Sequence, residues 1–177
     1  KSSETETQTE TQKPVETSIH LVDTIIGLPG ADLPKYDGTH FVYATAKVKV
    51  TPGEKANDLI VANGVNVPTG EADQFGGVFK NFLIIDNGTG SSKRSLKVWS
   101  LDEKKIIFET PYEVIASIQG DKLTYTKPVE TKKPVPCKDA AQWKKDGLQV
   151  GYGVAASFDF TKKSEELAKE ISCFPLQ

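Results

Sequence analysis

The stretch "LQVGYGVAASFDF", residues 148–160, carries the strongest fold signal in the chain. Apolar side chains occupy every second position, whereas the intervening positions, from Gln149 to Asp159, carry polar or small residues. Because successive side chains of a strand point to opposite faces of a sheet, this alternation predicts a strand with one buried face. Gly151 and Gly153 indicate a bend in that strand or the close approach of a neighbouring segment.

Strand patterns continue on the N-terminal and C-terminal sides of this stretch. Residues 41–50 alternate and predict one continuous strand with a lysine-bearing outer face. Residues 79–86 are largely apolar, with an unbroken run from Phe82 to Ile85, and predict a strand covered on both faces. Residues 164–173 fit a return strand or a capped helix. The strand is favoured because so short a helix has poor intrinsic stability.

One short helix is expected at 137–147, "CKDAAQWKKDG", with Asp139 capping its start and Gly147 ending it. Short turns separate the other elements, and this spacing favours an antiparallel meander. The chain is therefore predicted to be all-β and mainly antiparallel, with roughly nine or ten strands and this one helix. A meander hides its edges either as a barrel or as a β-sandwich, and both architectures stay open.

The N-terminal segment differs from the rest in composition. Residues 1–16 contain one aliphatic residue and no aromatic residue, which predicts a disordered tether before a single β-rich domain at 17–177. The chain starts at Lys1 and contains no methionine, which favours a processed product. A polar leash of this kind follows a signal peptide or the lipidated cysteine of a bacterial lipoprotein. A lipid anchor N-terminal to Lys1 is one interpretation, and a plain disordered end is the other.

Two cysteines, Cys137 and Cys173, lie far apart in the chain, and each lacks a second cysteine nearby. A zinc site requires closely spaced cysteine pairs or histidines, and His20 and His40 are distant in sequence. The even count predicts one disulfide, which would stabilise the fold by roughly 3–4 kcal/mol. Disulfides persist outside the reducing cytoplasm, so the expected location is extracytoplasmic: periplasm, cell envelope or secreted.

Composition disfavours several classes of function. The chain has 22 Lys and Arg against 24 Asp and Glu, a net charge of −2, and no strongly basic balance that would indicate a nucleic-acid partner. No stretch approaches the roughly 18–20 apolar residues of a transmembrane segment. The sequence contains no serine-nucleophile elbow, zinc-protease motif, P-loop or dinucleotide fingerprint. A monomer without cofactor or metal is expected.

The stretch "FLIIDNGTG", residues 82–90, ends an apolar run in Asp86 and then in glycines separated by small polar residues. It resembles the first phosphate-binding loop of actin-like ATPases, a likeness that implies nucleotide binding with the aspartate near a metal. In that family the loop opens a much larger two-lobed fold and acts with a second phosphate loop, which this chain lacks. A hairpin turn between two strands needs the same residues and is the favoured interpretation.

Three aromatic residues are candidates for ligand binding. Phe41 and Tyr43 fall on the lysine-bearing face of the 41–50 strand, and Trp99 shares a face with Lys97. Exposed aromatic rings on a sheet suit a sugar or a peptide. The alternative is that a second layer of structure covers them.

Three functions are compatible with the sequence. The first is a non-catalytic, tethered binding module of the cell envelope, whose partner is a protein, a glycan or a small ligand. The second is a secreted hydrolase that uses loop carboxylates. The third is a structural or adhesive surface module without a pocket. The missing catalytic motifs favour the first and third. The loop carboxylates are Asp23, Asp32, Asp37, Glu71 and Asp73.

Overall fold

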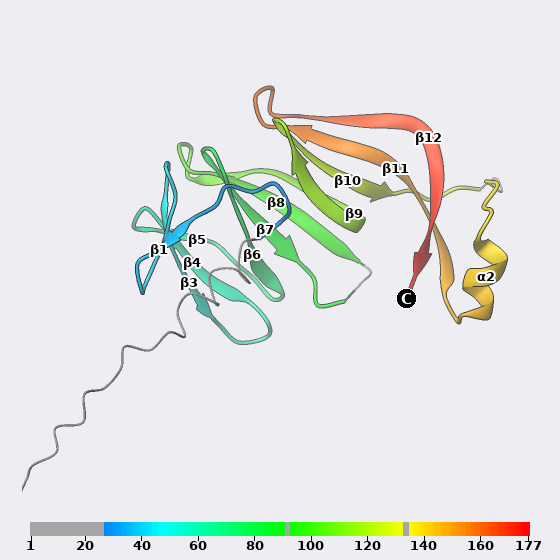
Figure 1. Cartoon of the computed structure of the whole chain (residues 1–177), viewed down its shortest axis with the longest axis horizontal. Coiled ribbons are helices and arrows are strands. Elements are labelled where there is room, and N and C mark those ends of the chain that lie inside the picture. Colours follow the sequence, from blue (N-terminus) through cyan, green and yellow to red (C-terminus); the bar gives the residue numbers. More distant parts are fainter. Residues whose placement is uncertain (1–26, 91–92, 133–134) are drawn as a thin grey trace, which may run out of the picture.

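A computed structural model describes residues 27–90, 93–132 and 135–177, which form two antiparallel sheets and one short helix (Figure 1). The five-stranded sheet follows chain order through β1 (Lys35–Tyr36), β2 (Phe41–Val42), β3 (Lys47–Pro52), β4 (Asp58–Ala62) and β5 (Val65–Val67). The seven-stranded sheet follows chain order through β6 (Asp73–Phe79), β7 (Phe82–Asn87), β8 (Arg94–Ser100), β9 (Lys105–Gln119), β10 (Lys122–Pro128), β11 (Gln149–Asp159) and β12 (Ser164–Leu176). The helix α2 (Ala140–Lys145) precedes β11. The predicted antiparallel all-β meander is confirmed.

Within the described residues, neither sheet closes into a barrel. β6 and β12 are the two edges of the seven-stranded sheet, and β1 and β5 are the edges of the other. One apolar cluster takes its members from the five-stranded sheet and from β6 to β8, so the two sheets pack face to face. The sandwich alternative therefore fits the structure. The twelve described strands exceed the nine or ten expected, partly because one predicted strand is split. The predicted tether at 1–16 lies outside the described residues, and so do residues 17–26, whose pattern predicts a first strand.

Strand β7 is buried on both faces, as its apolar run predicted. The prediction of one strand over 79–86 is wrong at its start, because Phe79 ends β6 and residues 80–81 form the turn into β7. Leu83 and Ile85 belong to the cluster between the two sheets. Phe82 and Ile84 point the other way, into a second cluster formed with β8 to β11. None of the four is more than 9% exposed.

The seven-stranded sheet curls over this second cluster through β9. The first half of β9 pairs with β8 as far as Tyr112, and the second half pairs with β10 from Glu113 onward. Both ladders contain a register shift, and a bulge of this kind bends a strand and increases its twist. β11 and β12 bend together as well (Figure 1), and their ladder shifts register after Val154. The curl brings β9 to β11 over the second face of β7.

The 41–50 segment forms a hairpin, so the prediction of one continuous strand is wrong. The Tyr43 N–H donates to the Ala46 carbonyl (2.7 Å), and Phe41 pairs with Val48. The tight turn reverses the alternation, so Phe41 and Tyr43 share the buried face with Val48. The two residues inside the turn are an alanine and a threonine, which carry none of the usual turn signals.

The C-terminal region follows the predictions closely. β12 shows that the tail is a strand, and α2 forms where a helix was expected. Gly147 follows the helix with φ +78°, the conformation that commonly ends helices. The expected side-chain cap is absent, because Asp139 precedes the helix without a capping hydrogen bond.

A disulfide joins Cys137 to Cys173, as the cysteine count predicted. It ties the segment that precedes α2 to the C-terminal part of β12. Of the strands, the covalent loop contains β11 and most of β12, at one edge of the seven-stranded sheet.

Replacing both cysteines, Cys137→Ser with Cys173→Ser, should lower the free energy of unfolding by about 2–4 kcal/mol, because the loop is no longer closed in the unfolded chain. Denaturant titration measures this loss. Hydrogen exchange should accelerate first within 135–177. Two thiols that react freely with an alkylating agent in the folded, unreduced protein would contradict the disulfide.

Residues 27–32 cover the free edge of β6 and extend to β9. The Leu28 N–H donates to the Gly76 carbonyl (2.9 Å), and the Asp32 N–H donates to the Val78 carbonyl (2.8 Å). The Ile118 N–H of β9 donates to the Pro29 carbonyl (2.7 Å). This segment therefore connects the first strand of the curled sheet with its fourth.

Gly30→Ala should destabilise the protein far more than Gly64→Ala, as thermal unfolding would measure. Both glycines have positive φ, +84° and +77°, so both variants incur a backbone cost of about 1–2 kcal/mol. A Cβ at Gly30 would also lie 2.0 Å from the Ile118 carbonyl oxygen, whereas one at Gly64 would meet no atom of the described residues within 4 Å. Equal losses in the two variants would show that the segment does not contact β9.

Candidate functional site

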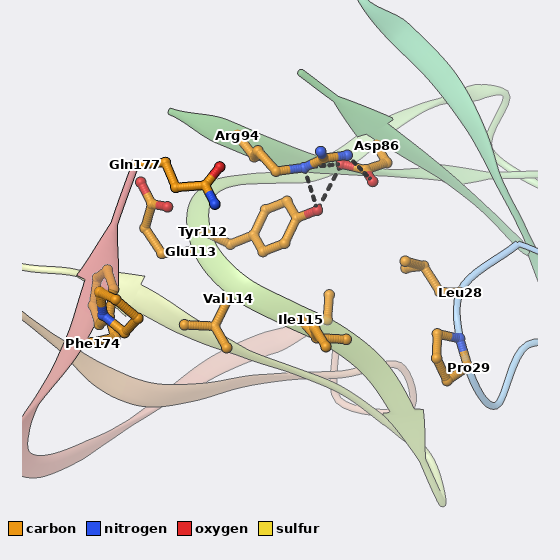
Figure 2. A pocket seen from close by; sticks show the side chains of 12 residues that line it. Leu28, Pro29, Asp86, Arg94, Tyr112, Glu113, Val114, Ile115, Phe174 and Gln177 are labelled. Atoms are coloured by element: carbon orange, nitrogen blue, oxygen red, sulfur yellow. Dashed lines mark hydrogen bonds and ion pairs between the residues drawn. The ribbon is translucent and has the colours of Figure 1, made fainter. Parts of the chain in front are cut away.

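A cavity of about 510 Å³ lies where β8 begins at Arg94 and β9 continues past this end of β8 (Figure 2). We call it the β9 cavity. Its walls are the turn at 28–29, the facing ends of β7 and β8, the bulged part of β9 at 112–116, and the end of β12. The volume is within the range of about 300–1,000 Å³ that is usual for small-molecule sites.

One wall is a polar group formed by Asp86, Arg94 and Tyr112. Arg94 Nη2 pairs with Asp86 Oδ2 (2.5 Å), and Arg94 Nε donates to the Tyr112 hydroxyl (2.8 Å). The same hydroxyl donates to Asp86 Oδ1 (2.8 Å), and Arg94 Nη1 donates to the Gly90 carbonyl (2.8 Å). The three side chains satisfy one another and connect β7, β8 and β9.

The charges in this group are fixed by their neighbours. Burial raises the pKa of Tyr112 well above its usual range, and the Asp86 carboxylate adds to this effect. Burial alone would lower the pKa of Arg94, but Asp86 and Tyr112 outweigh it and raise that pKa. Tyr112 therefore stays a neutral donor, and Arg94 stays a cation.

The opposite wall is apolar and unusually exposed. Val114 and Ile115, at the bulge of β9, are 52% and 76% exposed. Figure 2 shows both below the polar group, with Leu28 on one side and Phe174 on the other. Val114 has φ +64°, a conformation that is rare for a β-branched residue and costs about 1–3 kcal/mol. Such strain is concentrated at functional sites.

Between the two walls lies Glu113, which is only 6% exposed. Its Oε1 accepts the backbone N–H of Lys93 (3.1 Å). Its Oε2 is buried and has no hydrogen-bond partner within the described part of the chain. A buried carboxylate oxygen without a hydrogen-bond partner raises the free energy of the folded protein. A ligand group that donates a hydrogen bond to this oxygen would offset that cost.

Phe174 reaches the cavity because two glycines make room for its ring. A Cβ at Gly151 would lie 2.6 Å from the ring, and one at Gly153 would lie 3.0 Å from it. The close approach predicted for these glycines of β11 is therefore present.

The aromatic residues selected from the sequence lie elsewhere. Phe41, Tyr43 and Trp99 are 7%, 6% and 5% exposed, inside the cluster between the sheets. The expectation of exposed rings is wrong, and the alternative of a covering layer is correct. None of the three lines the β9 cavity, and a role for them in ligand binding stays a prediction.

Each described loop carboxylate that was proposed for a hydrolase makes its own separate contact with a backbone N–H group or a lysine. Asp23 lies outside the described residues. Asp32 and Asp37 accept backbone N–H groups, and Glu71 and Asp73 pair with lysines. The contacts are Lys80 N–H to Asp32 (2.7 Å), His40 N–H to Asp37 (2.7 Å), Lys55 to Glu71 (3.8 Å) and Lys97 to Asp73 (2.8 Å).

The loop after Asp86 is a connection between strands. Asn87 of β7 pairs with Ser95 of β8, so the preferred interpretation as a hairpin is confirmed. Asp86, which the likeness to a phosphate loop placed near a metal, instead pairs with Arg94. Within 27–90, 93–132 and 135–177, no group of three or more His, Cys, Asp or Glu side chains is arranged to hold a metal ion.

Comparison with protein-family models, with curated proteins and with solved structures finds no match to this chain. In the same described ranges, no helix has the length and apolar character needed to cross a membrane.

The Asp86–Arg94 pair should couple strongly in a double-mutant cycle with Asp86→Asn and Arg94→Met. The two side chains are 16% and 23% exposed, so an interaction energy of about 1–3 kcal/mol is expected from denaturant titration. The exposed Lys55–Glu71 pair is the control, with about 1 kcal/mol or less. Equal coupling in both pairs would contradict a specific role for the polar group.

Proposed function

We propose that the chain is a non-catalytic, extracytoplasmic binding module that takes a small ligand into the β9 cavity. The observation that carries the proposal is the combination of two exposed apolar side chains, Val114 and Ile115, with the unpartnered oxygen of buried Glu113. Ligand sites typically combine apolar walls with a few placed polar groups, and this cavity has that composition.

The conformation of the bulge favours binding over a purely structural role. A structural module gains nothing from a valine in a strained conformation whose side chain remains half exposed. Ligand binding would bury Val114 and Ile115 and so recover the cost of exposing them.

The polar wall favours binding over hydrolysis. Both Asp86 oxygens are engaged by Arg94 and Tyr112, so this carboxylate is held as part of the wall. The described loop carboxylates are likewise engaged in separate contacts.

The disulfide supports the proposed location, since disulfides persist in oxidising compartments. The polar composition of 1–16 supports a tether, and a lipid anchor before Lys1 belongs to the same proposal. With a lipid anchor, the module would hold its ligand at the cell envelope. Without one, the module would be secreted and would carry the ligand with it.

A fragment screen by NMR tests the proposed function. Hits should shift the resonances of 112–116 and 174–176, and Ile115→Arg should weaken their binding at least about tenfold. Because Ile115 is 76% exposed, the melting temperature of this variant should stay that of the parent.

Leu59→Arg is the matched control, since Leu59 is 53% exposed on β4 and does not line the β9 cavity. Hits that bind both variants equally, or that map to other surfaces, would contradict ligand binding in the β9 cavity. A screen without hits would favour the structural module.

A further inference from the structure

We infer that the β9 cavity selects a ligand with an alkylammonium group on an apolar body, and that Glu113 recognises the ammonium. The inference rests on the proposed function and specifies its ligand class. The preferred source is a small amphiphilic amine, because the cavity has the volume of a small-molecule site.

The first step concerns the positive charge already present. Arg94 is the one cationic side chain among the described residues that line the cavity, and its guanidinium is committed to Asp86, Tyr112 and Gly90. It is therefore not free to neutralise Glu113. The acidic side chains in the lining are Asp86 and Glu113, so the lining side chains sum to one negative charge (two negative, one positive).

The second step concerns the position of Glu113. Its Oε1 is fixed by the Lys93 N–H, while Oε2 is unpartnered in the part of the chain that the structure describes. A ligand N–H donor would supply the missing hydrogen bond, and a cationic donor would also balance the charge. A carboxylate or phosphate ligand would place a second anion beside a buried one.

The third step concerns the apolar body. Val114 and Ile115 follow Glu113 directly in the strand, and Phe174 lines the cavity beside it. Glu113 and Phe174 also line a neighbouring cavity of about 590 Å³, whose wall includes Lys132. A ligand that places its ammonium at Glu113 can lay its chain over the bulge of β9, where exposed apolar surface would be buried.

Three matched probes test the inference in calorimetry with the full chain: 4-phenylbutylamine, 4-phenylbutan-1-ol and 4-phenylbutanoate. The amine should bind at least about tenfold more tightly than the alcohol, and the carboxylate should not bind measurably. Glu113→Gln should remove the preference for the amine, while Ile115→Ser should weaken the amine and the alcohol equally.

Glu109→Gln is the control for charge, because Glu109 lies on the same strand, is exposed and does not line the cavity. The comparison of probes on the parent protein needs no variant, so it decides the question even if Glu113→Gln folds poorly. Thermal unfolding of each variant confirms that the compared proteins are folded.

Equal binding of all three probes would overturn recognition by Glu113 and leave ligand binding in the cavity intact. Failure of every probe, with no hits in the fragment screen, would overturn both. A capped peptide, acetyl-Phe-Leu-Lys-amide, distinguishes the source of the ammonium. Tighter binding of this peptide than of the amine would support the ammonium chemistry and identify a lysine side chain of a protein as its source.

Discussion

Strand β7 needs apolar cover on both of its faces, and the rest of the fold supplies it. Leu83 and Ile85 are covered by the five-stranded sheet, and Phe82 and Ile84 are covered by strands further along the same sheet. A flat seven-stranded sheet could not return over its own strand. The long strand β9 provides the bend that the sheet needs. It pairs with β8 over its first half and with β10 over its second, and the bulges in both ladders curve it. Residues 27–32 then connect the edge of β6 to β9.

The β9 cavity is a consequence of this arrangement. β8 stops pairing with β9 at the Arg94–Tyr112 position, and β9 continues without β8 until Pro29 accepts from Ile118. The gap between these two contacts is lined by one edge of β9 and by the end of β12. At the start of β8, Asp86, Arg94 and Tyr112 bind one another. Glu113, the next residue along β9, is left with a buried oxygen that has no partner within the described residues.

Local patterns were sufficient to predict much of the fold from the sequence. β11, the strand at the C-terminus and the two-sided burial of β7 follow from the spacing of apolar residues over short ranges. The disulfide followed from a count of two cysteines. The reversal at 43–46 was not predictable, because Ala44 and Thr45 form a tight turn without glycine, proline, asparagine or aspartate. That single turn places Phe41 and Tyr43 in the core and not on the expected outer face.

The β9 cavity departs from the alternation of buried and exposed side chains that predicted strands elsewhere in the chain. Alternation along 112–118 places Val114 inside with Tyr112 and Ala116, and it places Glu113 outside. The structure reverses the two, since Glu113 is 6% exposed and Val114 is 52% exposed, whereas Tyr112 and Ala116 remain buried. The bulge of β9 and the positive φ of Val114 produce this reversal, which exposes an apolar side chain and buries a charged one. Both changes destabilise the fold in the absence of a ligand. The apolar body of a ligand would cover the exposed valine, and its cationic group would pair with the buried carboxylate.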